Sequence, residues 1–308
     1  MFLNVLLLVF GFIFLVRGAD VFVDGSAAIA RRWHIPEIVI GLTIVAMGTS
    51  APEAAVSIVS AFHGANGVAI GNIFGSNIAN ILLILGVTAT ISTLIVARNT
   101  THYEIPFVGF ITLLLMWLGW RYGVISHVGA AVLFGLFLLF LGYLFFVSKD
   151  VPGDDLSPEK HMSWAKIILY IVGGIIALVL GSNMTVNSAV AIAHVLNVSD
   201  RIIGLTIVAV GTSLPELVTC VVAATKGQSD IAIGNIVGSN IFNILFVLGI
   251  AGLIHTIPFE SAFLIDGAVA TISVVLLFAA TARSGKMTRT VGILFVLLYV
   301  FYVIYTIV

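Results

Sequence analysis

An internal duplication limits the fold of this chain more than any other feature of its sequence. Residues 40–86 align without a gap with residues 203–249 at a shift of 163, and 29 of these 47 positions are identical. The match continues more weakly upstream at three positions in each half: Gly18, Asp20 and Asp24 align with Gly181, Asn183 and Asn187. The sequence therefore predicts two equivalent halves that share one fold.

The chain is too apolar to cover a water-soluble surface. Of its 308 residues, 60% are hydrophobic and 9% are charged, and its mean hydropathy is +1.21, whereas soluble domains carry about 25% charged residues. Its apolar runs are long and continuous, which indicates membrane-spanning helices rather than a barrel. The composition excludes a soluble enzyme and a disordered chain. The single cysteine, Cys220, excludes a disulfide scaffold, and the net charge of −1 argues against a nucleic-acid binder.

About 20 apolar residues cross a bilayer as a helix, and this rule gives ten candidate spans: 2–30, 36–62, 67–95, 104–120, 124–147, 166–193, 199–225, 230–254, 260–282 and 287–307. We interpret the first as a retained helix, because no positive charge precedes it and it has a counterpart in the second half. The polar stretch 148–163 is a linker between 1–147 and 164–308. Each half then holds five spans, and because five is odd the second half is inverted in the membrane. The expected fold is an all-α polytopic membrane protein of ten helices in two inverted five-helix repeats.

The distribution of Lys and Arg predicts the orientation. With the N-terminus outside, ten basic residues fall in inside loops: Arg31, Arg32, Arg98, Lys149, Lys160, Lys166, Lys226, Arg283, Lys286 and Arg289. Only Arg121 and Arg201 fall outside. We therefore expect both termini outside and the linker in the cytoplasm.

Two motifs occur in both halves, and the first places a glutamate midway along a span. Gly48-Thr-Ser-Ala-Pro-Glu53 returns as Gly211-Thr-Ser-Leu-Pro-Glu216. A carboxylate at the bilayer centre costs at least about 2.5–3.5 kcal/mol. An ion pair would offset this cost, but no Lys or Arg lies between Arg32 and Arg98. Protonation of both glutamates is a second explanation, and a cation bound from solution is the third and favoured one.

The residues around each glutamate are suited to a cation. Thr49 and Ser50 precede Glu53 by four and three positions, so a helical path places their oxygens on its side. Pro52 has no N–H and leaves the carbonyl of Gly48 without its helical partner. We therefore expect helices 2 and 7 to be discontinuous and to expose carbonyls as ligands, those of Ala46, Met47, Gly48 and Thr49 in the first half and those of Ala209, Val210, Gly211 and Thr212 in the second.

The second repeated motif adds hydroxyl and amide oxygens. Gly71-Asn-Ile-Phe-Gly-Ser-Asn-Ile-Ala-Asn80 returns as Gly234-Asn-Ile-Val-Gly-Ser-Asn-Ile-Phe-Asn243. Each copy sets a serine four residues before an asparagine on one helical face, namely Ser76 with Asn80 and Ser239 with Asn243. Hydrogen bonding between helices is the simpler explanation for such residues. We favour a role as ligands.

Every group in the two motifs offers oxygen, and this is the chemistry that Ca²⁺ prefers. Softer metals would favour sulfur or imidazole, and Mg²⁺ dehydrates reluctantly. Two carboxylates balance either one Ca²⁺ or two monovalent ions. An empty site would hold two buried charges, so the carrier would avoid crossing unloaded and would act as an antiporter.

At these motifs the sequence resembles the prokaryotic sodium/calcium exchangers of the calcium/cation antiporter superfamily, and the resemblance covers the whole chain. It implies exchange of Ca²⁺ for Na⁺ by alternating access in a prokaryotic cytoplasmic membrane, with the motif helices as a core across which spans 1 and 6 slide. It implies that Glu53 and Glu216 chelate Ca²⁺ with backbone oxygens of Thr49 and Thr212. The implied Na⁺ sites combine both glutamates with six further residues: Ser50, Ser213, Ser76, Ser239 and the carbonyls of Ala46 and Ala209. Asn80 falls at the central amide position of the family.

Asn243 departs from the family pattern, since many members have Asp there, so proton coupling stays open as an alternative to Na⁺. An intramembrane hydrolase and a passive channel are further alternatives, but the seven histidines fall near span ends or in loops, and two buried carboxylates bind too tightly for conduction. Asp20 and Asp24 either line an ion passage, pair with Arg17 or cap local backbone. The expected partners are Ca²⁺, Na⁺ and the lipid bilayer, without a cofactor or nucleic acid; the sequence carries no signal for an oligomeric state.

Overall fold

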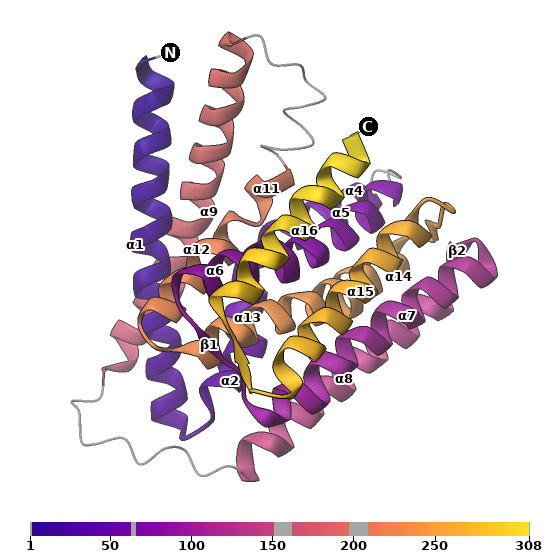
Figure 1. Ribbon diagram of the computed structural model, residues 1–308, viewed down its shortest axis with the longest axis horizontal. Coiled ribbons are helices and arrows are strands. Elements are labelled where there is room, and N and C mark those ends of the chain that lie inside the picture. The colour runs from indigo at the N-terminus through magenta and orange to yellow at the C-terminus, as the bar shows by residue number, and fades with distance from the viewer. Residues whose placement is uncertain (1, 63–65, 151–161, 197–208, 308) are drawn as a thin grey trace.

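The computed structural model describes residues 2–62, 66–150, 162–196 and 209–307, which form a helical bundle with two short strand pairs (Figure 1). The first half contains α1 (Phe2–Trp33), α2 (Glu37–Ile40), η1 (Gly41–Val45), α3 (Ala46–Thr49), α4 (Ala51–Phe62), α5 (Asn66–Ile78), η2 (Ala79–Leu85), α6 (Gly86–Ile91), β1 (Leu94–Ile95), η3 (Thr100–Glu104), α7 (Ile105–Tyr122), β2 (Val124–Ile125) and α8 (His127–Asp150). The second half contains α9 (Trp164–Val195), α11 (Ala209–Thr212), α12 (Leu214–Thr225), α13 (Ser229–Ile241), η5 (Phe242–Val247), α14 (Leu248–Ile254), β3 (Ile257–Pro258), α15 (Phe263–Ala282), β4 (Lys286–Met287) and α16 (Arg289–Ile307).

Eight of the described helical stretches are long and apolar enough to cross a membrane: Phe2–Trp33, Ala69–Ile91, Thr100–Tyr122, His127–Phe146, Trp164–Val195, Ser229–Ile254, Phe263–Ala282 and Arg289–Thr306. Each coincides with a predicted span. The span predicted at 36–62 is present as two helices, Glu37–Thr49 and Ala51–Ile58, bent by 51°. The span predicted at 199–225 appears as the shorter helix α12 and begins outside the described residues. The all-helical membrane fold is thus confirmed.

The two copies of the second motif lie in the most deeply buried helices. Each copy begins in an α-helix, α5 or α13, and continues into a π-helical turn, η2 or η5. Asn80 and Asn243 therefore sit in π-turns and not in the regular α-helix that the sequence suggested. A π-turn widens the helix by one residue and is frequent at functional sites. In Figure 1 the helices α7, α8, α15 and α16 lie on one side of the bundle and α1 and α9 on another.

The helices α1 and α9 pack against each other along their length. Glycines allow their backbones to come close. A Cβ at Gly18 would lie 2.9 Å from the Cβ of Ala177, and one at Gly174 would lie 2.7 Å from the Cβ of Phe22. Small residues serve this purpose widely between membrane helices. We call these two helices the α1–α9 pair.

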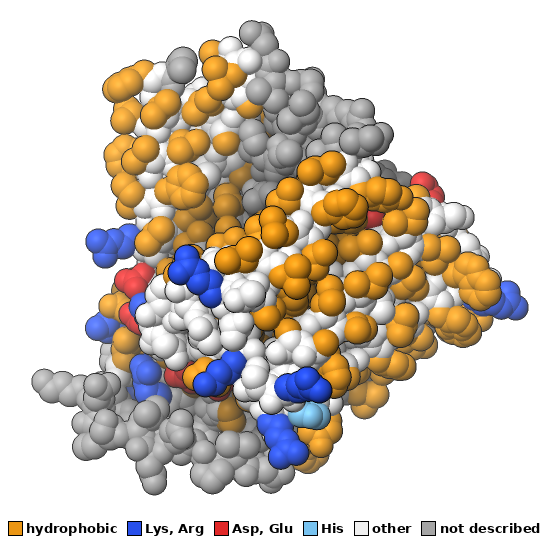
Figure 2. Space-filling view, in the orientation of Figure 1, with side chains coloured by type: hydrophobic (Ala, Val, Ile, Leu, Met, Phe, Trp, Pro, Cys, Tyr) orange, Lys and Arg blue, Asp and Glu red, His pale blue; other side chains and the backbone are white. Residues whose placement is uncertain are grey.

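Two antiparallel strand pairs join the halves. In the first, Leu94 of β1 faces Met287 of β4. In the second, Ile125 of β2 faces Ile257 of β3. Each pair thus contains one strand from each half. The outer surface of the bundle is covered by hydrophobic side chains over α15, α16 and α7, while blue and red charged side chains gather at its edges (Figure 2). This distribution suits a lipid-facing belt.

Candidate functional site

Both copies of the first motif break a helix at their serine. Ser50 separates α3 from α4 with φ −83° and ψ 9°, and Ser213 separates α11 from α12 with φ −89° and ψ 7°. Each proline follows in the first turn of the new helix, where its missing N–H is tolerated. Glu53 and Glu216 come directly after these prolines. The predicted discontinuity is therefore present at both positions.

The two glutamates are buried to the same extent, with 1% of each residue exposed. The hydroxyl of Ser50 donates a hydrogen bond to Oε1 of Glu216 over 2.8 Å. The carboxylates of Glu53 and Glu216 are also close enough to interact electrostatically. Residues from both halves thus form one centre inside the bundle, as the sequence predicts.

A cluster of amides also joins the two halves. Asn80 Nδ2 donates to Asn240 Oδ1 over 2.9 Å, and Asn243 Nδ2 donates to Asn77 Oδ1 over 3.2 Å. Two backbone carbonyl groups also accept hydrogen bonds from these amides. Asn77 Nδ2 donates to the Asn240 carbonyl over 3.3 Å, and Asn240 Nδ2 donates to the Asn77 carbonyl over 3.4 Å. These bonds fix the amide groups of Asn80 and Asn243 with their nitrogen atoms toward protein partners.

Six of the predicted ligands hold a buried oxygen without a hydrogen-bond partner among the described residues: Glu53 Oε2, Glu216 Oε2, Asn80 Oδ1, Asn243 Oδ1, Ser213 Oγ and Ser239 Oγ. Buried polar atoms are nearly always satisfied in proteins, so such a group of exceptions calls for an explanation. Four of the six oxygens can only accept, if the glutamates are ionised. A bound cation would satisfy acceptors of this kind.

The other predicted ligands are placed as follows. Thr49 is fully buried, and its hydroxyl donates to Asn235 Oδ1 over 2.8 Å. Ala46 and Ser76 are buried, and Thr212 ends α11 in a half-buried position. The backbone of Ala209 begins α11.

Four residues that hydrogen-bond to predicted ligands were not singled out from the sequence. Asn77, Asn235 and Asn240 lie within the second motif, and their identity between the two halves was a usable signal. For Ser182 on α9 the sequence contained no such signal. Its hydroxyl donates to the carbonyl of Gly211 over 2.9 Å, which is the carbonyl that Pro215 leaves without a helical N–H.

We expect Ser182→Ala to destabilise the protein by about 0.6–2 kcal/mol, because the buried carbonyl of Gly211 would lose its donor. Ala19 occupies the matching position on α1, so alanine fits the packing of these helices. Thermal unfolding of the purified protein would measure the loss. Ser261→Ala, in the exposed turn before α15, is the control and should leave the midpoint unchanged. An unchanged midpoint for Ser182→Ala would contradict the role of this hydrogen bond.

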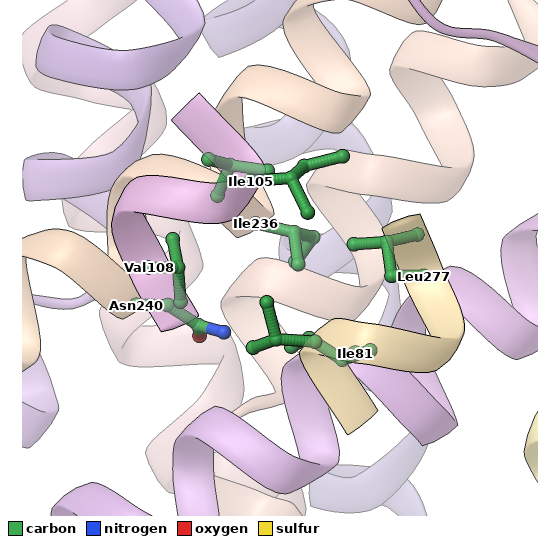
Figure 3. Close-up of a pocket in the computed structure, with 8 residues that line it drawn as sticks. Ile81, Ile105, Val108, Ile236, Asn240 and Leu277 are labelled. Carbon is green, nitrogen blue, oxygen red and sulfur yellow. The ribbon is translucent and has the colours of Figure 1, made fainter. Parts of the chain in front are cut away.

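The pocket in Figure 3 is a different feature. Its lining is apolar apart from Asn240, and includes Ile81, Ile105, Val108 and Ile236. It contains no carboxylate. The described residues also hold no group of three or more His, Cys, Asp or Glu side chains suited to a metal.

A lipid-facing helical bundle with a buried, oxygen-rich centre at two helix breaks defines an integral membrane carrier for cations. Comparison with known proteins agrees. The model of the family described as "Sodium/calcium exchanger protein" matches residues 3–146 and 166–308. The chain therefore belongs to the sodium/calcium exchanger family, whose members are ion transporters and not enzymes.

Individual relatives cover nearly the whole chain. The sodium/calcium exchanger MaX1 of Methanosarcina acetivorans is 33% identical over 98% of this chain and 97% of its own length. The inner membrane protein YrbG of Escherichia coli is 34% identical over 96% of this chain and 94% of its own. The solved structure of the sodium-calcium exchanger NCX_Mj matches with a TM-score of 0.85 and 35% identity over 99% of both chains. The resemblance identified from the motifs is confirmed, and the chain is a membrane cation antiporter.

Proposed function

We propose that this protein exchanges Ca²⁺ for Na⁺ by alternating access at the centre formed by Glu53 and Glu216. The observation that carries the proposal is the group of six buried oxygens, drawn from both halves, that have no hydrogen-bond partner among the described residues. Ca²⁺ takes six to eight oxygen ligands in flexible geometry. The remaining ligands in this proposal are Ser50, Ser76 and backbone oxygens of Ala46, Thr49, Ala209 and Thr212.

The proposal includes the topology. Ten spans form two inverted repeats, 1–147 and 164–308, with a cytoplasmic linker and both termini outside a prokaryotic cytoplasmic membrane. Reciprocal contacts support the inverted repeat: Asn77 and Asn240, which are 163 positions apart, each donate to the carbonyl of the other. The strand pairs support it as well, because each joins one strand from either half.

Transport in liposomes tests the function directly. Purified protein would be reconstituted, and uptake of radioactive Ca²⁺ would be followed under an outward Na⁺ gradient at clamped pH, and separately under an outward H⁺ gradient without Na⁺. We expect uptake with the Na⁺ gradient and none with the H⁺ gradient. If neither gradient moves Ca²⁺ through folded protein, calcium is not the cargo.

Proton coupling is the second candidate, and Asn243 is the observation that favours it. The amide network contains asparagine at both central positions, Asn80 and Asn243, and thus adds no carboxylate to the two glutamates. Uptake driven only by the H⁺ gradient would assign the exchange to protons carried on Glu53 and Glu216.

We expect Asn243→Asp to lower the Na⁺ concentration for half-maximal Ca²⁺ exchange by at least about fivefold, since a further negative charge within a few ångströms attracts a monovalent cation by at least ~1 kcal/mol. The measurement is Na⁺-dependent Ca²⁺ efflux from liposomes. Asn72→Asp is the matched control, because Asn72 donates to Ser57 and lies outside the proposed ligand set. Equal Na⁺ dependence in the wild type and Asn243→Asp would rule out a role of this position in Na⁺ binding.

A further inference from the structure

The α1–α9 pair and the rest of the bundle have the geometry of two bodies. The first half of α1 is largely exposed apart from its contacts with α9, and its buried residues concentrate from Gly18 to Ala30. There α1 contacts α12, α2 and η1. In Figure 1 the pair also runs at a steep angle to α7, α15 and α16. Contacts between the two bodies therefore decide their relative position.

Among the described residues, Lys226 makes the ion pairs between these two bodies. This residue lies in the turn between α12 and α13. Its Nζ is 2.7 Å from Asp20 Oδ1 and 2.6 Å from Asp24 Oδ1, and it also donates to the Asp20 carbonyl over 3.0 Å. Both aspartates belong to α1. The partner of Asp20 and Asp24 is thus Lys226, which is a different residue from the Arg17 that the sequence suggested.

Lys226 is charged in this setting. Burial alone would lower the pKa of Lys226, but hydrogen bonds and charges from Asp20 and Asp24 outweigh it and raise the pKa above the usual value for lysine. The side chains are partly exposed, at 27% for Lys226 and 41% and 43% for the two aspartates. Water and salt therefore weaken the contact without abolishing it, so it can form and break during a transport cycle.

The contact has no charged equivalent in the other half. Asp20 and Asp24 align with Asn183 and Asn187 of α9, and Lys226 aligns with His63, which lies outside the described residues. In an inverted repeat, equivalent positions fall on opposite sides of the membrane. At the aligned positions the second half has two amides in place of the two carboxylates of the first half, and the first half has a histidine in place of Lys226.

We propose that Lys226, Asp20 and Asp24 form an ionic latch that holds the α1–α9 pair against the rest of the bundle at one side of the membrane only. The latch must break before that side opens. The latch lowers the free energy of the state in which that side is closed. The inward-open and outward-open states therefore differ in free energy, although the two halves are alike. This inference rests on the proposed function, because it assigns the two states of alternating access to movement of these bodies.

Distance measurements between the two bodies test the latch without any transport. Spin labels would be placed at Arg31 on α1 and at Ser284 in the turn before β4, in a Cys220→Ser background and in lipid nanodiscs. The variants are Lys226→Met, the double variant Asp20→Asn with Asp24→Asn, and Lys166→Met as a control. Lys166 lies on α9 over the ring of Tyr170, so the control removes the same charge without touching the latch.

We expect Lys226→Met to raise the population of molecules with the longer distance between the two spin labels by about tenfold, because two partly exposed ion pairs are lost. The double aspartate variant should do the same. Exchange of the charges, with Lys226→Glu, Asp20→Lys and Asp24→Lys together, should restore the original distribution. Wild-type distances in both Lys226→Met and the double variant, or an equal shift in Lys166→Met, would overturn the latch. Absence of Ca²⁺ uptake in the liposome experiment would instead refute the proposed function and leave this distance result standing.

Discussion

Replacing Glu53 by glutamine should weaken Ca²⁺ binding about a thousandfold and abolish Ca²⁺ exchange. The substitution keeps the shape of the side chain and removes one of the two negative charges at the centre. At ~4 Å and the effective dielectric of a protein, one unit charge attracts another by about 4 kcal/mol, which corresponds to roughly three factors of ten in affinity. Uptake of radioactive Ca²⁺ by liposomes and calorimetric titration of the detergent-solubilised protein would measure both effects. Glu216→Gln should behave alike.

The chain offers a matched control in Glu104. This glutamate is also buried, with 4% of the residue exposed, and its Oε2, like those of Glu53 and Glu216, has no hydrogen-bond partner among the described residues. Its Oε1 accepts a hydrogen bond from the hydroxyl of Tyr143 over 2.6 Å, and it lies at the end of η3, outside both repeated motifs. Glu104→Gln should keep Ca²⁺ exchange close to the wild-type rate. Wild-type exchange in Glu53→Gln, or equal loss in Glu104→Gln, would show that the effect of Glu53 is not specific to an ion site.

Gly238→Ala is expected to destabilise the folded protein by about 1–3 kcal/mol, the usual cost of overpacking a tight core. A Cβ at Gly238 would lie 2.6 Å from the carbonyl oxygen of Leu42 and 2.8 Å from the Cβ of Ala46. The first of these contacts is with backbone, so no side chain can move aside to relieve it. The segment must shift instead, and with it the break that carries Glu53. Thermal unfolding and size-exclusion profiles in detergent would report the loss.

Gly173→Ala provides the comparison for this substitution. The added methyl group at Gly173 would meet no atom of the described residues within 4 Å, and alanine favours a helix over glycine by about 1 kcal/mol. Its stability should therefore equal or exceed that of the wild type. If Gly238→Ala melts at the wild-type temperature, α13 is less closely packed against η1 and α3 than the structure indicates.

The sequence predicted the features that follow from the length of apolar segments and from the missing N–H of proline. Apolar length predicts the spans, and nine of the ten predicted ranges coincide with a spanning helix or with the bent pair. The missing N–H of Pro52 and Pro215 predicts the two breaks, and both are present. The motifs also predicted the family correctly. The roles of Glu53, Glu216 and the ten other proposed ligands remain predictions until ions or variants test them.

Other features depend on tertiary packing and had no local signal. The π-turns that hold Asn80 and Asn243 look like ordinary helix in the sequence, because their residues have no distinctive composition. Lys226 is distant from Asp20 along the chain, and a nearer basic residue, Arg17, made a local pair equally reasonable. Ser182 stands alone because Ala19 replaces it in the first half, so the duplication could not reveal it.

The two strand pairs have a consequence for how the protein is made. Leu94 and Ile95 pair with residues close to the C-terminus, and Val124 and Ile125 pair with residues of the second half. During synthesis the first half reaches the membrane before these partner strands have been made. The edges of β1 and β2 therefore stay open to water or to chaperones. The completed strand pairs then tie the two halves together. Separate expression of the halves should accordingly yield two chains that depend on each other to reach a stable fold.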